Sequence, residues 1–292
     1  WGSPRDERLL QRLSARRDET LGSLKTRGWV ARQGVWRRPA TAPNAEFVPE
    51  LVGKSALVRG ALDKLQGVFS LPPAAISLPL AVDDSYIDKK KGPYGIAGCR
   101  GHHVVARGDL HFAVYRDEFL LVTDRDLGIA VPEQDREFAK MLALYLNSRV
   151  VQYFQFMLSP QEGVKTGRTS LSHLRTVPLP FFAISAAEQK AWVDLHDRLA
   201  ASSQKLWEFA MHPTDGLGAP VSGPAHEHDL LLEELEDRVA SALSLRPQDR
   251  WLIDDHFDAK RHLVDGLMRA EATGPPDEAA LRAYADALRD TA

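Results

Sequence analysis

FAKMLALYLNSRVVQYFQFMLSPQEGVKTGRTSLSHLRTVPL, residues 138–179, is the stretch around which the chain is organised. Apolar side chains recur every three or four residues from Phe138 to Met157, which predicts a long buried helix. We interpret the aromatic residues on this face, Tyr145, Tyr153 and Phe154, as core. Pro160 and Gly163 end the helix, and a short helix over LSHLRT follows before the next prolines.

A polar, basic loop at residues 159–170 joins these two predicted helices. Loops held by rigid elements are where binding residues usually lie. We therefore expect this loop to expose the four candidate contact residues Gln161, Lys165, Arg168 and Thr169.

The chain before the long helix is predicted to be rich in β-structure. Residues 64–82 alternate short apolar runs with prolines, which indicates short strands joined by turns. The runs 103–106, 110–115 and 118–123 are rich in β-branched and aromatic residues, as strands are. Residues 64–131 are therefore expected to form mainly sheet, and the expected fold class is α+β.

Residues 85–109 (SYIDKKKGPYGIAGCRGHHVVARGD) concentrate positive charge among glycines. A flexible basic segment of this kind suits contact with nucleic-acid phosphates, and the alternative is a solvated charged loop. Cys99 is the one candidate metal ligand near the paired histidines, which disfavours a metal site. The second set of candidate DNA-contacting residues is Lys89, Lys90, Lys91, Arg100, His102 and His103.

The first residues of the chain are predicted to be helical and basic. A helix is expected over residues 4–17, and a second one over 18–27 should end at Gly28. Arg37 and Arg38 beside Trp36 suit phosphate contact with the ring stacking; the alternative is a packed ring with solvated arginines.

After residue 184 the sequence predicts helices only. Residues 188–209 are predicted to form one spacer helix, in which apolar residues recur at alternating spacings of four and three residues. Such a coiled-coil-like seam needs another helix to pack on. Glycine, proline and serine mark a linker at 211–225, and acidic and alanine-rich helices follow. The expected organisation is a mixed, β-rich domain with the long packed helix at 1–184, the spacer at 185–210, the linker, and a helical C-terminal region at 226–292.

Charge is divided unevenly along the chain of 292 residues, whose net charge is −3. Residues 1–38 hold ten Arg and Lys against four Asp and Glu, whereas residues 226–292 hold eight against sixteen. This division indicates either different partners for the two ends or two solvated faces of opposite charge.

The composition bounds the class of protein. A single cysteine excludes an internal disulfide and fits a reducing cytoplasm. No apolar run is long enough to span a membrane, so no membrane partner is expected. The chain begins with Trp1, and we expect it to be part of a longer polypeptide.

No catalytic constellation is evident in the sequence. It contains no P-loop, no HExxH and no GxSxG. Asp254, Asp255, His256 and Asp258 are predicted to form a solvated helix face, and His226 and His228 to be exposed beside the linker. The chain therefore reads as a binding or scaffolding part.

Several segments, taken in order, resemble a known family. They are WGSPRDERLLQRL, RGDLHFAVYRDEFLLVTDRDLGIAVP, LALYLNSRVVQYFQFMLSPQEGVKTGRTSLSHLRTVPLP and AAEQKAWVDLHDRLAASSQKL. Their succession resembles the C-terminal target recognition region of adenine-N6 DNA methyltransferases of restriction–modification and phage-defence systems, of the type I or fused restriction–methylation kind. LLEELEDRVASALSLRPQDRWLIDD is similar to the terminal helices of such chains.

The resemblance implies double-stranded DNA as a partner and a methyltransferase catalytic domain in cis or in trans. S-adenosyl-L-methionine is expected in that catalytic domain and not in this chain, because the family's Asn/Asp-Pro-Pro-Tyr/Phe motif has no match here. Enzyme activity, site-specific adenine methylation, would thus belong to the parent protein or complex. A protein–protein scaffold, with helical interfaces and incidental DNA contact, is the alternative function.

Overall fold

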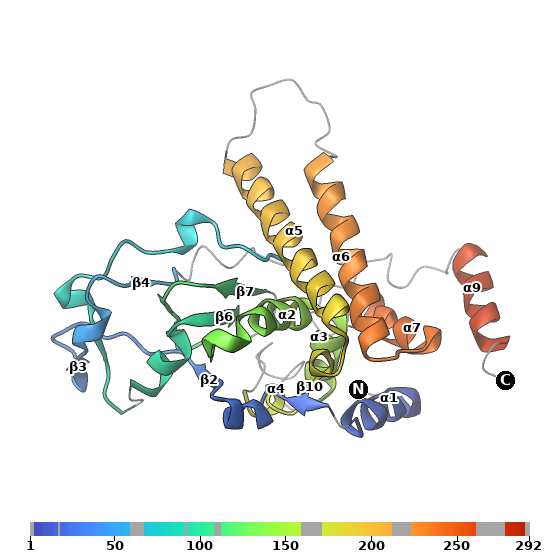
Figure 1. The fold of residues 1–292 in the computed structure, drawn as a ribbon, viewed down its shortest axis with the longest axis horizontal. Helices are drawn as coiled ribbons and strands as arrows, with labels where there is room; N and C mark the ends of the chain where they lie inside the picture. Colours follow the sequence, from blue (N-terminus) through green and yellow to red (C-terminus); the bar gives the residue numbers. More distant parts are fainter. Residues whose placement is uncertain are drawn as a thin grey trace.

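The computed structural model describes residues 3–16, 18–58, 67–90, 93–107, 112–158, 171–211, 223–260 and 278–289. The fold is α+β, as expected (Figure 1). The α-helices are α1 Pro4–Ser14, α2 Arg136–Asn147, α3 Arg149–Leu158, α4 Leu171–Leu174, α5 Ala186–Met211, α6 Gly223–Ala242, α7 Pro247–Asp255 and α9 Glu278–Arg289. Short 3₁₀ turns include η1 Ser23–Arg27, η2 Pro49–Leu51, η4 Pro73–Ala75, η5 Val82–Asp84, η6 Pro93–Cys99, η7 Glu133–Asp135 and η8 Pro180–Phe182, and the π-helical turn η9 His256–Lys260 follows α7.

A four-stranded antiparallel sheet in the order β2-β9-β6-β7 lies at the centre. Three two-stranded pairs accompany it: β1 with β10, β3 with β5, and β4 with β8. The strands are β1 Glu19–Thr20, β2 Val30–Gln33, β3 Ala45–Phe47, β4 Ser55–Ala56, β5 Tyr86–Asp88, β6 His102–Arg107, β7 Ala113–Arg116, β8 Leu120–Leu121, β9 Asp126–Val131 and β10 Pro178–Leu179.

Each face of the central sheet contributes to a different hydrophobic cluster. Val104 and Ala106 of β6 face the cluster that contains α2, α3 and α5, whereas Val105 faces the cluster beneath η6 and β8. This division follows from the strand period of two, which sends neighbouring side chains to opposite faces. The sheet is therefore covered by helices on one side and by irregular chain on the other.

The expected long helix is in fact two helices, α2 and α3, so a single continuous helix was wrong. Ser148 between them is extended, with φ −71° and ψ 148°. Its hydroxyl donates to the Tyr145 carbonyl at 2.7 Å and accepts from the Val151 amide at 3.4 Å. The hydroxyl thus satisfies backbone groups on both sides of the break, which a continuous helix would have satisfied internally. The predicted core residues Tyr145, Tyr153 and Phe154 are all buried.

Asn147 joins the end of α2 to the open edge of the sheet. Its side-chain amide accepts from the Ala113 N–H at 3.0 Å and donates to the Ala113 carbonyl at 2.7 Å. The Arg107 N–H bonds to the Phe112 carbonyl, so the next pair in the antiparallel ladder, Ala106 with Ala113, is not hydrogen-bonded. The N–H and the carbonyl of Ala113 therefore both point away from β6. Asn147 therefore takes the place of the missing neighbouring strand at Ala113.

The N-terminal helix α1 forms where the sequence predicts it. Ser3 caps it, Pro4 stands in its first turn, and the Asp6 carboxylate returns to the Ser3 N–H, which completes a capping box. The second N-terminal helix is only the 3₁₀ turn η1, which ends at Gly28 as expected, with φ +88°.

The helical region packs onto the sheet domain as one core. The spacer seam residues Trp192, Leu195 and Leu199 are fully buried, and α5 lies against α2 and α6, so the predicted helix partner is found within the chain (Figure 1). The hydrophobic cluster runs without interruption from Phe181 to Trp192, across the expected domain boundary at residue 184. No helix in the described ranges meets the length and apolarity of a bilayer span.

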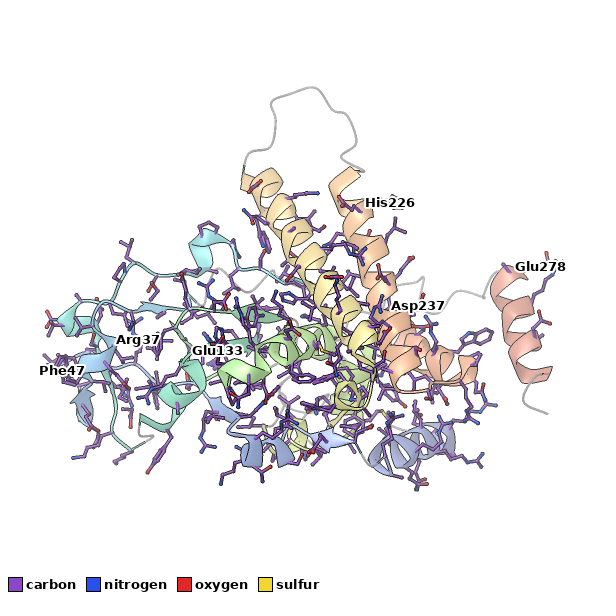
Figure 2. All side chains as sticks on the ribbon, viewed as in Figure 1. Arg37, Phe47, Glu133, His226, Asp237 and Glu278 are labelled. Carbon is purple, nitrogen blue, oxygen red and sulfur yellow. The ribbon has the colours of Figure 1, made fainter. Side chains whose placement is uncertain are left out.

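Several local expectations were wrong. The described part of 64–82 holds η4 and an isolated bridge in place of strands, because Pro72 and Pro73 cannot donate to a ladder. Residues 126–131, within the region 64–131 that was expected to be mainly sheet, do form a strand, the central strand β9. His228 is buried, bonded to the Ser202 hydroxyl and the Gly67 carbonyl, whereas His226 is exposed as predicted (Figure 2). His256 is buried between Tyr153 and Phe156, so it does not belong to a solvated face.

We predict that Asn147→Ala lowers the free energy of unfolding by about 2–4 kcal/mol, because it leaves the Ala113 N–H and carbonyl without partners in the core. Denaturant unfolding of both proteins measures the loss. Glu137→Gln, an exposed change in the same helix, should alter the stability by less than about 0.5 kcal/mol. Equal unfolding midpoints for the two variants would show that the Asn147 contact is dispensable.

Candidate nucleic-acid interface

The four residues expected to read DNA, Gln161, Lys165, Arg168 and Thr169, lie outside the described residues, as does Lys91. The structure does describe both ends of their loop. Before it, Phe154 and Phe156 of α3 are buried, and after it Leu174 of α4 is buried. Helices α3 and α4 also pack against each other. The described residues next to the predicted loop, Leu158 and Leu171, thus belong to two helices that pack against each other.

The N-terminal helix is fastened to the same region. Asp6 of α1 accepts a hydrogen bond from the Tyr153 hydroxyl of α3 at 2.7 Å. At its other end, Arg12 pairs with Asp249 of α7 at 2.5 Å. This places α1, with its exposed Arg5 and Arg8, beside the helix that leads into the loop.

The exposed cations near the loop ends lack carboxylate partners. Among the described residues, no ion pair involves Arg5 or Arg8 of α1, or Lys25 of η1. The nearby acids Glu7 and Glu19 hydrogen-bond instead to Gln11 and Ser23. Unpaired surface cations of this kind produce a local positive potential that attracts polyanions.

Two further arginines meet at the edge of the sheet. Arg175, directly after α4, donates to the Ala31 carbonyl at 3.2 Å, and Arg32 of β2 donates to the same carbonyl at 3.4 Å. Both side chains are half-buried. No carboxylate contacts either guanidinium in the part of the chain that the structure describes. The nearby His173 Nδ1 of α4 is buried and has no hydrogen-bond partner among the described residues.

Sequence reasoning did not single out Arg32 or Arg175. Each is an isolated arginine in an otherwise ordinary segment, and Ala31 and Arg175 are 144 residues apart. The pairing of β1 with β10 and the packing of α4 on β2 bring the two segments together. The sequence contains no local signal for this meeting.

The second set of predicted DNA-contacting residues is divided by the structure. Lys89 and Lys90 follow β5 and are exposed, at the end of the molecule where Phe47 is labelled (Figure 2). Arg100 is exposed but pairs with Glu50 at 2.6 Å. His102 lies between two carboxylates, with Nδ1 2.8 Å from Asp117 and Nε2 against Glu133. Figure 1 shows the β3–β5 pair, which Lys89 and Lys90 follow, well away from α4.

His103 has a structural environment. It is buried in β6, and its Nδ1 bonds to the Gly101 carbonyl at 3.0 Å. Burial lowers the pKa of His103 to about 4 in spite of that bond. A neutral, buried imidazole cannot supply positive charge to a phosphate at neutral pH.

The glycine-rich basic segment is packed against the sheet in its described part. A Cβ added to Gly98 would lie 2.4 Å from the Gly128 carbonyl oxygen of β9, and one added to Gly95 would lie 2.7 Å from the Gln33 carbonyl oxygen. These glycines allow η6 to approach the β2–β9 backbone closely. The interpretation of residues 93–103 as a flexible segment is therefore corrected.

The Trp36 region fits neither of its two sequence interpretations. Trp36 is 39% exposed, with the Arg38 guanidinium 3.6 Å from its ring centroid. Arg38 also pairs with Asp88 at 2.9 Å, and Arg37 pairs with Asp84 at 3.4 Å. The ring is stacked, but on the chain's own arginine, and both charges are balanced.

No group of three or more His, Cys, Asp or Glu side chains in the described ranges has an arrangement that could hold a metal ion. The exposed polar network around Tyr115 links its hydroxyl to Asp117 at 2.5 Å and to Arg136 at 2.9 Å. Burial, together with the hydrogen bond to Asp117, raises the pKa of Tyr115, so this hydroxyl is protonated. The network joins β7 to α2 and contains no activated nucleophile.

We predict that Gly98→Ala destabilises the protein by roughly 1–3 kcal/mol, because the new methyl group overlaps the Gly128 backbone. Thermal unfolding measures the change. Gly53→Asn is the matched control, since Gly53 has open space around it and asparagine tolerates its φ of +77°. A Gly98→Ala protein as stable as this control would mean that η6 does not need the close approach.

We predict that His103 contributes to acid unfolding. Between pH 6.5 and 4 the unfolded chain binds a proton at His103 and the folded chain does not, so stability falls as the pH falls through this window. The loss should total roughly 3 kcal/mol at pH 4. His103→Leu should flatten this part of the pH–stability curve, whereas His226→Leu at an exposed site should leave it unchanged. Parallel curves for the wild type and both variants would contradict the assignment.

Neither a comparison with protein-family models nor one with curated proteins finds a match for this chain. The function must therefore be argued from the residues and their arrangement. The features that bear on it most are the packed helices α3 and α4 and the nearby cations that have no carboxylate partner among the described residues.

Proposed function

We propose that this chain is the sequence-specific, double-stranded DNA recognition module of an S-adenosyl-L-methionine-dependent adenine-N6 DNA methyltransferase of a restriction–modification or phage-defence system. The catalytic domain would lie upstream or on another chain. One observation carries the proposal: α3 and α4, the helices on either side of the predicted loop, pack together beside exposed cations that have no carboxylate partners in the described part of the chain.

The contrast with the helical region supports a polyanionic ligand. There, Arg198 pairs with Glu234 at 2.7 Å, Arg238 with Glu188 at 2.7 Å, and Arg250 with Asp237 at 2.6 Å. A paired arginine must give up its carboxylate before it binds a phosphate. Arg5, Arg8 and Lys25 have no such partner to lose and can release counterions from DNA directly.

The proposed mechanism divides the work between the loop and the cations around it. Cations at the loop ends hold the DNA backbone and set the position of the duplex. The Gln161 amide suits an adenine edge in the major groove, and Lys165 and Arg168 suit guanine. With the duplex held, the catalytic domain can flip the target adenine out of the stack and methylate it.

The alternative, a protein–protein scaffold, loses its main support in the structure. The coiled-coil-like seam that would have bound a partner is fully buried at Trp192, Leu195 and Leu199, against α2 and α6 of the same chain. A partner subunit would have to use another surface. DNA recognition therefore remains the better-supported function.

We predict that Lys165→Ala combined with Arg168→Ala removes sequence preference and weakens binding to the preferred duplex by ~10-fold or more, since each base contact contributes roughly 1–3 kcal/mol of discrimination. Selection from a randomised duplex pool, followed by sequencing, identifies the preferred site. Titration of that duplex then compares the two proteins, and thermal unfolding should be unchanged.

The control removes two cations that have carboxylate partners, Arg198→Gln with Lys205→Gln on α5. It should retain the sequence preference of the wild type. A loop variant that selects the same sites with the same affinity would refute the role of the loop. A wild-type chain that binds no duplex at low salt would refute DNA recognition itself.

A further inference from the structure

The open edge of strand β2 carries a feature that the loop does not explain. β2 is an outer strand of the central sheet, paired only with β9 in that sheet. The Gly34 N–H bonds to the Asp126 carbonyl, and hydrogen-bonded and non-hydrogen-bonded pairs alternate along an antiparallel ladder. Ala31, three residues before Gly34, is therefore in a non-hydrogen-bonded pair, and its carbonyl points away from β9. This outward carbonyl accepts from both Arg32 and Arg175.

Two guanidinium groups on one carbonyl lie side by side and repel each other. A neutral carbonyl oxygen cannot balance two positive charges, and no carboxylate among the described residues contacts either group. Each arginine has five N–H donors, so most of the donors of both side chains remain available. The arrangement thus has the charge and the donors for an anion with several oxygens.

The backbone at Arg175 and the Cβ of Arg32 are held in place. The Arg175 N–H donates to the Leu171 carbonyl at 3.1 Å, and its carbonyl accepts from the Gly22 N–H at 3.0 Å. A Cβ at Gly98 would lie 3.3 Å from the Arg32 Cβ, so η6 packs directly against the Arg32 stem. Each guanidinium also bonds to the Ala31 carbonyl, so binding an anion removes less side-chain freedom than it would from a fully exposed arginine.

The position of the pair indicates which anion it takes. Arg175 follows α4, the helix at which the basic loop 159–170 rejoins the chain. An anion held here would therefore lie near the C-terminal end of the proposed recognition loop. Planar, forked guanidinium groups match the non-bridging oxygens of a phosphate in a bidentate geometry.

We propose that Arg32 and Arg175 form a phosphodiester clamp that holds one backbone phosphate of the bound duplex and sets the register of the recognition loop. This inference rests on the proposed function. It assigns the pair to positioning and not to base reading, so the pair contributes affinity to every sequence equally.

The test measures duplex affinity across a salt series for the wild type, Arg32→Gln, Arg175→Gln and the double variant. Because the two arginines hold the same phosphate, loss of the pair should reduce the slope of log affinity against log salt by about 0.9, and each single variant should reduce it by no more than that. At low salt the double variant should bind roughly ten- to a hundred-fold more weakly on preferred and non-preferred duplexes alike. The sites selected from a random pool should not change.

The matched control, Arg250→Gln with Arg282→Gln, removes two cations that pair with Asp237 and Glu278 and should keep the wild-type slope. Thermal unfolding identifies a variant that fails to fold. Arg32→Gln keeps the test decisive in that event, because Arg175 still satisfies the Ala31 carbonyl.

The outcomes separate the two proposals. A wild type that selects sites, with a folded double variant that keeps the wild-type salt slope, overturns the clamp and leaves DNA recognition standing. A double variant that selects different sites overturns the positioning role. A wild type that binds no duplex overturns the proposed function and the clamp with it.

Discussion

The side-chain amide of Asn147 fixes the arrangement on which the rest of the molecule depends. It supplies both hydrogen bonds that the edge residue Ala113 would otherwise have received from another strand. A buried sheet edge with neither bond would cost several kcal/mol. The contact also ends α2 against β7, and Ser148 then starts α3 as a separate helix. The direction of α3, and with it the starting point of the loop 159–170, follows from one amide.

The second anchor of the loop comes from the opposite end of the chain. Glu19 of β1 pairs with Leu179 of β10, and the Gly22 N–H bonds to the Arg175 carbonyl. These bonds bring the N-terminal segment to the place where α4 packs on β2. The basic N-terminal segment and the basic loop are distant in sequence, yet the fold places the first beside both ends of the second. The proposed interface for a polyanion would thus be assembled from segments that are distant from one another in sequence.

Local patterns predicted the elements, and tertiary contacts decided what those patterns missed. The apolar periodicity identified α5 and the core face of α2 and α3, because burial of one helix face leaves a direct trace in sequence. The break at Ser148 was missed because it depends on Ala113, a residue of another element. Strand β9 lies in the region 64–131 that was expected to be mainly sheet, but its central place, where Gly128 admits Gly98, depends on contacts with other segments. The loop residues Gln161, Lys165, Arg168 and Thr169 lie outside the described residues and stay predictions.

The number of charged residues in a segment is a poor measure of the charge available for binding, because many of these residues form ion pairs within the fold. Residues 1–38 contain ten Arg and Lys. Five of these residues have carboxylate partners in the fold: Arg12, Arg16, Arg27, Arg37 and Arg38. Arg27 pairs with the buried Asp135, which also accepts a hydrogen bond from the Trp29 indole. The charge of Arg27 is therefore used to balance a buried carboxylate. Of the other five, Arg17 lies outside the described residues. The remaining four, Arg5, Arg8, Lys25 and Arg32, belong to α1, η1 and β2, on the elements that pack near α3 and α4. The positions of the unpaired cations would therefore attract a duplex. The net negative charge of the chain would oppose this attraction little, because several acids of the helical region, among them Glu234, Glu188 and Asp237, already pair with arginines there.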